Sequence, residues 1–349
     1  MAATVPPPAK RAQSNPNPTA PGNADSGWQE MPDVIDAEKF PAWVIDEGLG
    51  AKMPVYQSAG VVAADVKRAI IVGPGKLRDC WYYWNSMNNA LYIAAESDST
   101  IQRSEVSIMA PCFFTPKDQE AGAATDGVLT WGDTTWASGH YNKGPDSIEK
   151  YSSFTVMDKL VEYYMNRDIF PNLNTVVIAG HSLGAQLSQH YAALRSTTDN
   201  DDRLHFWIAN PGSLLWLSKD RPAPNDACDG VDVYKYGLSS GFPGYAKGAA
   251  RTLGREGIVS QYNSRNIHYA WGMDDDGKGD TRCQAVTQGS THLERGQNFV
   301  AMLKDINGGD LPASATVDYV EGVSHYNEGM MNSDQGIDKL FKLNYNGPS

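Results

Sequence analysis

The sequence predicts an α/β fold with a mainly parallel central sheet flanked by helices. Short runs of β-branched and apolar residues alternate along the chain with longer segments of helical apolar spacing. Turn signals rich in glycine and proline separate the two kinds of segment. A strand, a helix and a further strand in this order form right-handed βαβ units, which place consecutive strands in parallel.

The elements follow from these patterns in order. The expected strands are short and apolar, and they cover residues 66–72, 106–110, 174–179, 205–209 and 267–271. The expected helices repeat their apolar side chains at helical intervals, and they cover residues 79–94, 154–164, 184–194 and 336–343. Gly73-Pro74-Gly75 is a turn signal that ends the first strand.

The chain divides into a polar N-terminal segment and one folded domain. Residues 1–26 hold almost no large apolar side chain, so this segment is expected to be disordered. Its dibasic pair Lys10-Arg11 would mark the cleavage of a propeptide in a secreted protein. Residues 27–349 form the domain, and the segment that follows the strand 205–209, the sixth strand of the expected fold, is too long for a structureless loop. We therefore expect residues 212–261 to form a cap over the carboxyl edge of the sheet.

Composition excludes some partners. The net charge of −12 and the acidic pI of about 5.0 argue against nucleic acid and anionic membranes, which require a basic surface. No apolar run approaches the ~18 residues of a membrane span. Residues 1–5 lack the charged and apolar regions of a signal peptide. The protein is therefore expected to be cytoplasmic, or secreted after removal of a signal.

The four cysteines are too widely spaced for a CxxC metal or redox motif, and they are Cys80, Cys112, Cys228 and Cys283. Their even number allows two disulfides in a secreted protein. Four buried free thiols, which pack as small apolar residues, are the alternative. We expect neither a metal ion nor an organic cofactor.

A nucleophile motif stands between an expected strand and an expected helix. Gly180-His181-Ser182-Leu183-Gly184 matches G-x-S-x-G, and the strand–turn–helix context is the one this motif requires in the α/β-hydrolase fold. The turn would expose Ser182 at the sheet edge and place the Leu183 N–H at the helix start, where it can stabilise an oxyanion. The alternative is a serine that merely caps the helix.

A nucleophilic serine needs a histidine base, and in this fold the histidine comes last along the chain. His325 lies in a loop after the apolar run 317–320, close to the C-terminus, and is the expected base. The other histidines that follow Ser182 are expected to pack in the core or to lie on the surface. His190 shares the helix that follows Ser182, His205 and His268 lie in strands, and His292 opens a polar helix that should be exposed.

The acid that orients the base should follow a strand between the serine and the histidine. The strand 267–271 ends at Gly272-Met273-Asp274-Asp275, and the usual G-x-x-D spacing selects Asp275. Asp274 remains the alternative. The second oxyanion donor should come from the loop 73–79, where Pro74 has no N–H. Gly75, Lys76 and Leu77 remain as candidates, and Lys76 is favoured among them. The alternative is that this loop binds nothing and only turns the chain.

Residues 68–343 together resemble a fungal type of α/β-hydrolase that is assumed to act on carboxylic esters. The residues that carry this resemblance are Leu77-Arg78-Asp79, Tyr83-Trp84-Asn85, Ala110-Pro111-Cys112-Phe113-Phe114, Trp131 to Gly139, Phe170-Pro171-Asn172-Leu173, Gly180-His181-Ser182-Leu183-Gly184, Ile208-Ala209-Asn210-Pro211-Gly212-Ser213, Tyr234-Lys235-Tyr236-Gly237, Cys283-Gln284-Ala285, Gln288-Gly289 and Gly322-Val323-Ser324-His325. One departure is Val72-Gly73-Pro74-Gly75, because such proteins often carry His-Gly ahead of the oxyanion loop. The resemblance implies a secreted protein, with Cys228–Cys283 as the first bridge.

The expected activity is hydrolysis of a carboxylic ester, lactone or thioester of small-molecule size through an acyl-enzyme on Ser182. An acyltransferase or cyclase with the same residues is one alternative, and a binding protein on a hydrolase scaffold is another. The cap aromatics are expected either to shape an apolar substrate pocket or to pack the cap onto the core, and they are Trp216, Tyr234, Tyr236, Phe242 and Tyr245. The sequence does not indicate an oligomeric state.

Overall fold

The computed structural model describes residues 14–346, and its centre is an eight-stranded sheet. The strand order is β10-β9-β8-β7-β5-β6-β4-β3. The strands of this sheet are β3 (Ala37–Asp46), β4 (Ala51–Ser58), β5 (Arg68–Gly73), β6 (Val106–Pro111), β7 (Thr175–His181), β8 (Leu204–Ala209), β9 (Asn266–Gly272) and β10 (Ala315–Val320). Strand β4 pairs antiparallel with β3 and β6, and every other pairing is parallel. The predicted α/β fold with a mainly parallel sheet is confirmed.

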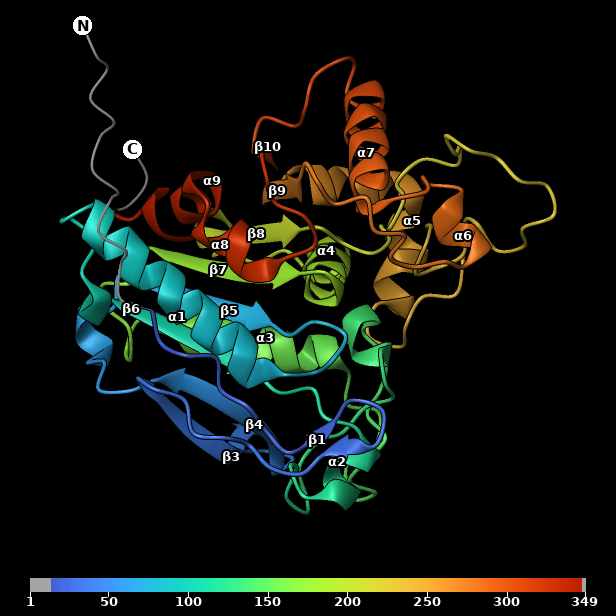
Figure 1. Cartoon of the computed structure of the whole chain (residues 1–349). Helices are drawn as coiled ribbons and strands as arrows, with labels where there is room; N and C mark the ends of the chain where they lie inside the picture. The colour runs from blue at the N-terminus through green and yellow to red at the C-terminus, as the bar shows by residue number, and fades with distance from the viewer. Residues whose placement is uncertain (1–13, 347–349) are drawn as a thin grey trace, which may run out of the picture.

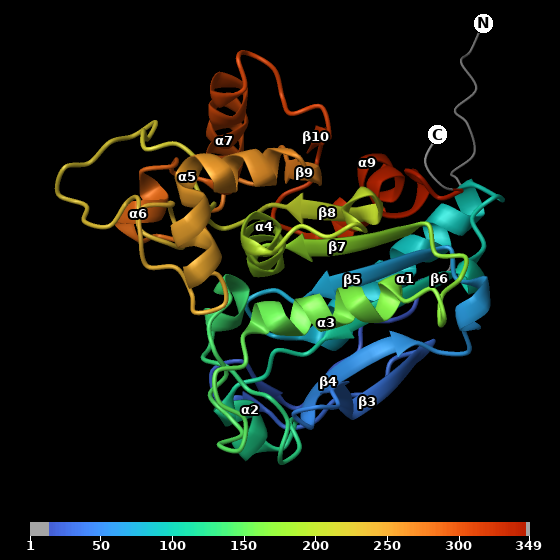
Figure 2. The ribbon, with the colours of Figure 1, turned by 180° about the vertical axis from the view of Figure 1, so that it is seen from behind.

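Helices cover both faces of the sheet. Helix α1 lies in front of the sheet in Figure 1 and behind it in Figure 2, whereas α3 has the opposite placement. The α-helices are α1 (Cys80–Ser97), α2 (Pro116–Ala121), α3 (Ser153–Met165), α4 (Leu183–Leu194), α5 (Lys247–Asn263), α6 (Cys283–Val286), α7 (His292–Ile306), α8 (Asn327–Asn332) and α9 (Asp334–Ile337). Residues of α1, α8 and α9 share one apolar core with the sheet, and residues of α3, α4, α5 and α7 share the other.

The strands and helices predicted between residues 66 and 343 are present within a few residues of their expected limits. The last predicted helix, over residues 336–343, is not a regular α-helix, because α9 continues into a π-helical turn over Asp338–Lys342. The antiparallel pair β3–β4 was not predicted. Its strand β3 is mostly exposed or half-buried and lacks the continuous apolar run of the central strands.

The prediction that residues 1–26 are disordered is wrong for residues 14–26. Asn15 is buried, its N–H donates to Asn89 Oδ1 at 2.8 Å, and its carbonyl accepts from Asn89 Nδ2 at 3.0 Å. A two-stranded ribbon follows, formed by β1 (Gly22–Asn23) and β2 (Gly27–Trp28). Polar contacts to α1 therefore order a segment that has few apolar side chains. Residues 1–13, including Lys10-Arg11, lie outside the described residues.

The segment between β8 and β9 lies beyond the carboxyl ends of the parallel strands (Figure 1). Helix α5 forms its second half, and residues 210–246 contain turns without a helix or strand. This part is held by individual contacts instead. Arg221 donates to the Tyr236 carbonyl, and the ring of Trp216 packs edge-on against Phe299 of α7, with 5.7 Å between the centroids.

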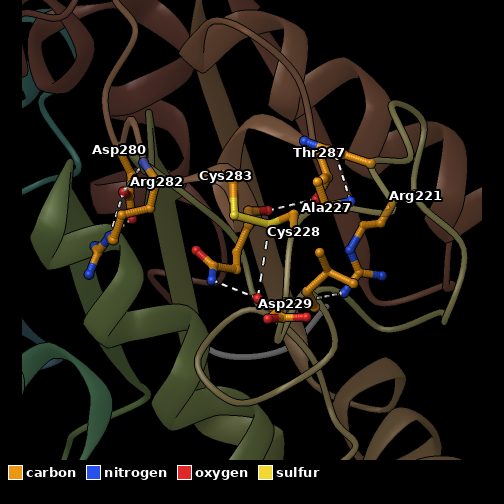
Figure 3. Close-up of a disulfide and its surroundings, with 11 residues drawn as sticks. Arg221, Ala227, Cys228, Asp229, Asp280, Arg282, Cys283 and Thr287 are labelled. Atoms are coloured by element: carbon orange, nitrogen blue, oxygen red, sulfur yellow. Dashed lines mark hydrogen bonds and ion pairs between the residues drawn. A yellow bond between two sulfur atoms is a disulfide. The ribbon is translucent and has the colours of Figure 1, made fainter.

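Two disulfides link segments that are distant along the chain. Cys80 pairs with Cys112, and Cys228 pairs with Cys283, which was the first expected bridge. Figure 3 shows that the second bridge joins the turn at residues 227–229 to the segment that carries Asp280 and Arg282. Disulfides of this kind are compatible with a secreted protein. Within residues 14–346, no helix has the length and hydropathy needed to cross a bilayer.

The buried histidines make the stability of the fold depend on pH. Burial lowers the pKa of His190 to about 3 and that of His205 to about 4, from an ordinary value of 6.5. The unfolded chain therefore binds more protons than the folded one once the pH falls below 6.5. We expect the free energy of unfolding, measured with urea, to fall steadily from about pH 7 to about pH 5.

The variant His190→Gln tests this reading. Glutamine does not titrate and keeps a donor that can reach the Ala137 carbonyl, which lies 2.8 Å from His190 Nδ1. Its stability should therefore depend less steeply on pH, by about 1.4 kcal/mol per pH unit for one proton. Identical slopes for the variant and the wild type would contradict the assignment of a neutral His190.

Candidate active site

The turn from β7 to α4 holds Ser182 in an unusual backbone conformation. Its φ of 58° and ψ of −118° are rare for a residue with a side chain. The two flanking glycines are required by close packing. A Cβ on Gly180 would lie 2.1 Å from the Gly184 carbonyl, and one on Gly184 would lie 2.6 Å from the Gly73 oxygen. The Ser182 side chain makes no capping bond to α4.

Ser182, His325 and Asp275 form a chain of hydrogen bonds. Ser182 Oγ lies 2.9 Å from His325 Nε2, and His325 Nδ1 lies 2.7 Å from Asp275 Oδ2. Asp275 follows β9 and is fully buried, whereas its alternative Asp274 is exposed. His325 follows β10, so the carboxyl ends of three strands bring the expected residues together.

His292 completes the surroundings of Asp275, and the prediction that it is exposed is wrong. It is 5% exposed, and its Nδ1 lies 2.9 Å from Asp275 Oδ1. Its ring stacks on His325, with 4.1 Å between the centroids and 14° between the planes. The polar composition of α7 was misleading because Arg295 is also buried, where it donates to the Asp280 carbonyl. The one sequence signal for the position of His292 was the capping pattern Thr291-x-x-Glu294, which predicts that His292 lies in the first turn of the helix.

The electrostatics of this cluster favour an ionised Asp275. Burial opposes its charge, but the hydrogen bonds from His292 and His325 outweigh burial and hold the pKa of Asp275 below its ordinary value. Burial also lowers the pKa of His292, although its bond to Asp275 acts in the opposite direction. A neutral His292 therefore donates from Nδ1 to one carboxylate oxygen, while His325 donates to the other.

The same three side chains offer atoms that lie within 4.8 Å of one another, the spacing of a metal site. Each Asp275 oxygen, however, faces a histidine nitrogen at hydrogen-bond distance. The arrangement therefore fits a carboxylate that orients two imidazoles.

The expected oxyanion donors lie beside Ser182. Leu183 begins α4, so its N–H has no partner within the helix. Lys76 lines the same cavity as Ser182 and Leu183. Its loop is held by a buried ion pair between Arg78 and Asp118, with 2.9 Å from Nε to Oδ2. Trp28 Nε1 also donates to the Leu77 carbonyl at 2.7 Å, so the ordered N-terminal segment supports this loop.

The cavity at Ser182 has a volume of about 480 Å³, the size of a small-molecule site. Most of the residues that line it have polar or charged side chains. They are Lys76, Thr134, Ser182, Leu183, Gln186, Gly212, Lys235, Gly279, Asp280, Thr281, Arg282, His292 and His325.

The five cap aromatics are absent from the lining of this cavity, which is against the expected apolar substrate pocket and in favour of the alternative, packing of the cap onto the core. Trp216 packs against Phe299, and Phe242 lies against Tyr234, with 5.8 Å between their centroids. The hydroxyl groups of the three tyrosines bond within the protein instead: Tyr234 to the Ser138 carbonyl, Tyr236 to Asp280 and Tyr245 to Asp158. These residues pack the cap segment onto the domain.

Comparisons with known proteins identify the fold. A poly(aspartic acid) hydrolase-1 from Sphingomonas sp. KT-1 aligns with a TM-score of 0.55 and 18% identity, over 87% of this chain and 98% of that one. The poly(3-hydroxybutyrate) depolymerase LpqC from Bordetella parapertussis aligns with a TM-score of 0.52 and 16% identity, over 81% of each chain. No family model and no curated protein matches the sequence significantly. The chain has the α/β-hydrolase fold.

The close packing of the turn predicts a strong effect of Gly184→Ala. The added Cβ would collide with the backbone oxygens of Gly73 and Pro74, so the turn or the loop 73–79 must move. We expect a loss of about 2 kcal/mol or more in the free energy of unfolding, measured with urea. The control is Gly248→Ala in α5, where nothing lies within 4 Å of the new Cβ. Equal stability of the two variants would contradict the packing argument.

Proposed function

We propose that this α/β-hydrolase-fold protein is a serine hydrolase that cleaves carboxylic esters through an acyl-enzyme. The observation that carries the proposal is the chain of hydrogen bonds from Ser182 through His325 to the buried Asp275. A serine hydroxyl is a weak nucleophile until a base removes its proton, and a histidine held by a carboxylate is suited to do so.

Acylation would begin when His325 Nε2 accepts the Ser182 proton. Ser182 Oγ attacks the ester carbonyl, and the N–H groups of Leu183 and Lys76 stabilise the oxyanion that forms. Asp275 holds His325 in the tautomer with its proton on Nδ1 and stabilises the imidazolium charge. The imidazolium then gives its proton to the leaving alcohol as the carbon–oxygen bond breaks.

Deacylation repeats these steps with water in place of serine. His325 accepts a proton from water, which attacks the acyl carbonyl, and Ser182 leaves with that proton. The same residues could hydrolyse a lactone or a thioester, since an acyl-enzyme on Ser182 is common to these substrates.

Other observations support an ester hydrolase. The similar structures are named a poly(aspartic acid) hydrolase and a poly(3-hydroxybutyrate) depolymerase. The sequence also resembles a fungal type of α/β-hydrolase assumed to act on carboxylic esters. Both disulfides suit secretion, where external esters would be the substrates.

Replacement of the nucleophile tests the proposal. Ser182→Ala should lower kcat/KM for p-nitrophenyl acetate by about 10³-fold or more, because no acyl-enzyme can form. A fluorophosphonate probe should label the wild type and not this variant, as seen by intact-protein mass spectrometry. Ser99→Ala, at an exposed serine, is the control and should be labelled and active.

Each of the other outcomes has a distinct meaning. Full turnover by Ser182→Ala would contradict the mechanism. A wild-type protein that neither reacts with the probe nor turns over esters would instead be a binding protein on this scaffold. Lactone or transferred ester among the products would identify a cyclase or an acyltransferase.

The second histidine at Asp275 predicts a positioning role. His292→Leu removes the donor to Asp275 Oδ1, and we expect kcat to fall about 10-fold to 100-fold, the worth of a hydrogen bond to a charged group. The KM should change little if the effect passes through His325. His292→Asn keeps a donor near the position of Nδ1 and should retain most of kcat. Equal losses in both variants would assign the effect to the ring and not to the hydrogen bond.

A further inference from the structure

The charge of the cavity at Ser182 differs from that of the whole protein. The chain carries a net charge of −12. The cavity lining, in contrast, includes the basic side chains of Lys76, Lys235 and Arg282 and a single carboxylate outside the Ser182–His325–Asp275 chain, that of Asp280. A positive surplus in a concave site attracts and holds an anionic ligand.

Lys235 is a largely buried cation with incomplete compensation. Its side chain is 16% exposed, and its Nζ donates to Gln186 Oε1 at 3.0 Å. The nearest carboxylate oxygen, Asp280 Oδ2, lies 3.8 Å away, beyond hydrogen-bond distance. An ammonium has three donors, so Lys235 can offer a donor to a ligand in the cavity. Burial, together with the nearby charge of Arg282, lowers the pKa of Lys235 to about 8 against the opposing effect of Asp280.

Asp280 is already engaged by other groups. Arg282 binds it through Nε at 2.7 Å and Nη2 at 2.6 Å, and the Tyr236 hydroxyl donates to it at 2.7 Å. Figure 3 shows Asp280 and Arg282 side by side, next to Cys283 of the disulfide. The Arg282 side chain is 58% exposed and keeps further N–H donors. Lys76 also lines the cavity, but it is not part of this group, in which Lys235 and Arg282 against one Asp280 leave a local surplus of one positive charge.

This surplus lies close to the nucleophile. Gln186, which accepts from Lys235, is on α4, and its N–H donates to the Ser182 carbonyl at 3.3 Å. The two residues are therefore four positions apart, about one helical turn, or about 6 Å along the axis. A ligand group that reaches Lys235 would be only a few bonds from a carbonyl at Ser182.

We propose that the cavity recognises a carboxylate on the substrate, so that the enzyme prefers esters bearing a free acid a few bonds from the scissile carbonyl. Lys235 and Arg282 bind this carboxylate, whose single charge matches the surplus. The proposal rests on the proposed ester hydrolysis. The carboxylate can belong to the acyl part or to the alcohol part of the ester, and the substrates below distinguish the two.

The experiment compares each acidic ester with its methyl-capped form. Mono-p-nitrophenyl glutarate and p-nitrophenyl methyl glutarate probe the acyl side, and 4-acetoxybutanoate and its methyl ester probe the alcohol side. For wild type, kcat/KM should favour the free acid by about 10-fold to 100-fold in at least one pair, as expected for charge-assisted hydrogen bonds. Added salt should reduce this preference.

Lys235→Met should remove most of the preference by lowering kcat/KM for the acidic ester far more than for the capped one. Arg282→Gln, at a more exposed side chain, makes the same comparison if Lys235→Met does not fold. The control is Lys159→Met, at a lysine that pairs with Glu162 on α3, and it should behave as wild type.

The outcomes separate this inference from the proposed function. Faster turnover of the capped ester in both pairs, or equal losses for both members of a pair in Lys235→Met, would overturn the carboxylate site and leave ester hydrolysis standing. Absence of turnover with every ester, together with an unlabelled Ser182, would overturn both.

Discussion

The buried carboxylate of Asp275 is the group on which the arrangement of the site depends. Burial of a charge is costly unless polar partners surround it, and both of its oxygens face histidines, His292 and His325. These histidines come from different elements, the start of α7 and the loop after β10. The ionised Asp275 therefore links three segments at the edge of the sheet: its own turn after β9, the start of α7 and the loop after β10.

Backbone contacts reinforce this convergence. The N–H of Met273 donates to the Val320 carbonyl at 2.9 Å, and that of Asp274 donates to Val323 at 3.0 Å. Asn210, at the end of β8, accepts from the Gly272 N–H at 2.9 Å and is itself fully buried. The turn that carries Asp275 and the loop that carries His325 are thus held by neighbours on both sides. With His325 held in this way, the tight turn after β7 is sufficient to place Ser182 Oγ within hydrogen-bond distance of His325 Nε2.

The sequence predicted those parts of the molecule that depend on local rules. Buried parallel strands are continuous apolar runs, and G-x-S-x-G is a consequence of close backbone packing, so strand positions and Ser182 could be read directly. The order of Asp275 and His325 follows from the topology of the fold. The position of His292 could not be read in this way, because its burial depends on how α7 packs against the turn after β9.

The order of residues 14–26 and the packing of the cap aromatics also depend on tertiary contacts, which composition does not show. Residues 14–26 are ordered by hydrogen bonds between asparagines of distant segments, and a count of apolar residues does not register such contacts. The cap aromatics suggested an apolar pocket, whereas tertiary contacts turn Trp216 and Tyr245 toward the domain. Composition shows how much apolar surface a segment has, but not which side of that segment is covered.

The contacts of the aromatic side chains in the segment 212–261 indicate what this segment does at the site. Tyr236 donates to Asp280, and its ring lies near both Lys235 and Arg282, with their cationic groups 5.4 Å and 5.5 Å from its centroid. An aromatic face attracts cations, so this tyrosine can hold two like charges near each other. The bridge Cys228–Cys283 fixes the residue next to Arg282 to the cap segment. Residues of the segment 212–261 thus hold charged side chains near Ser182, while its aromatic rings pack elsewhere instead of lining the cavity.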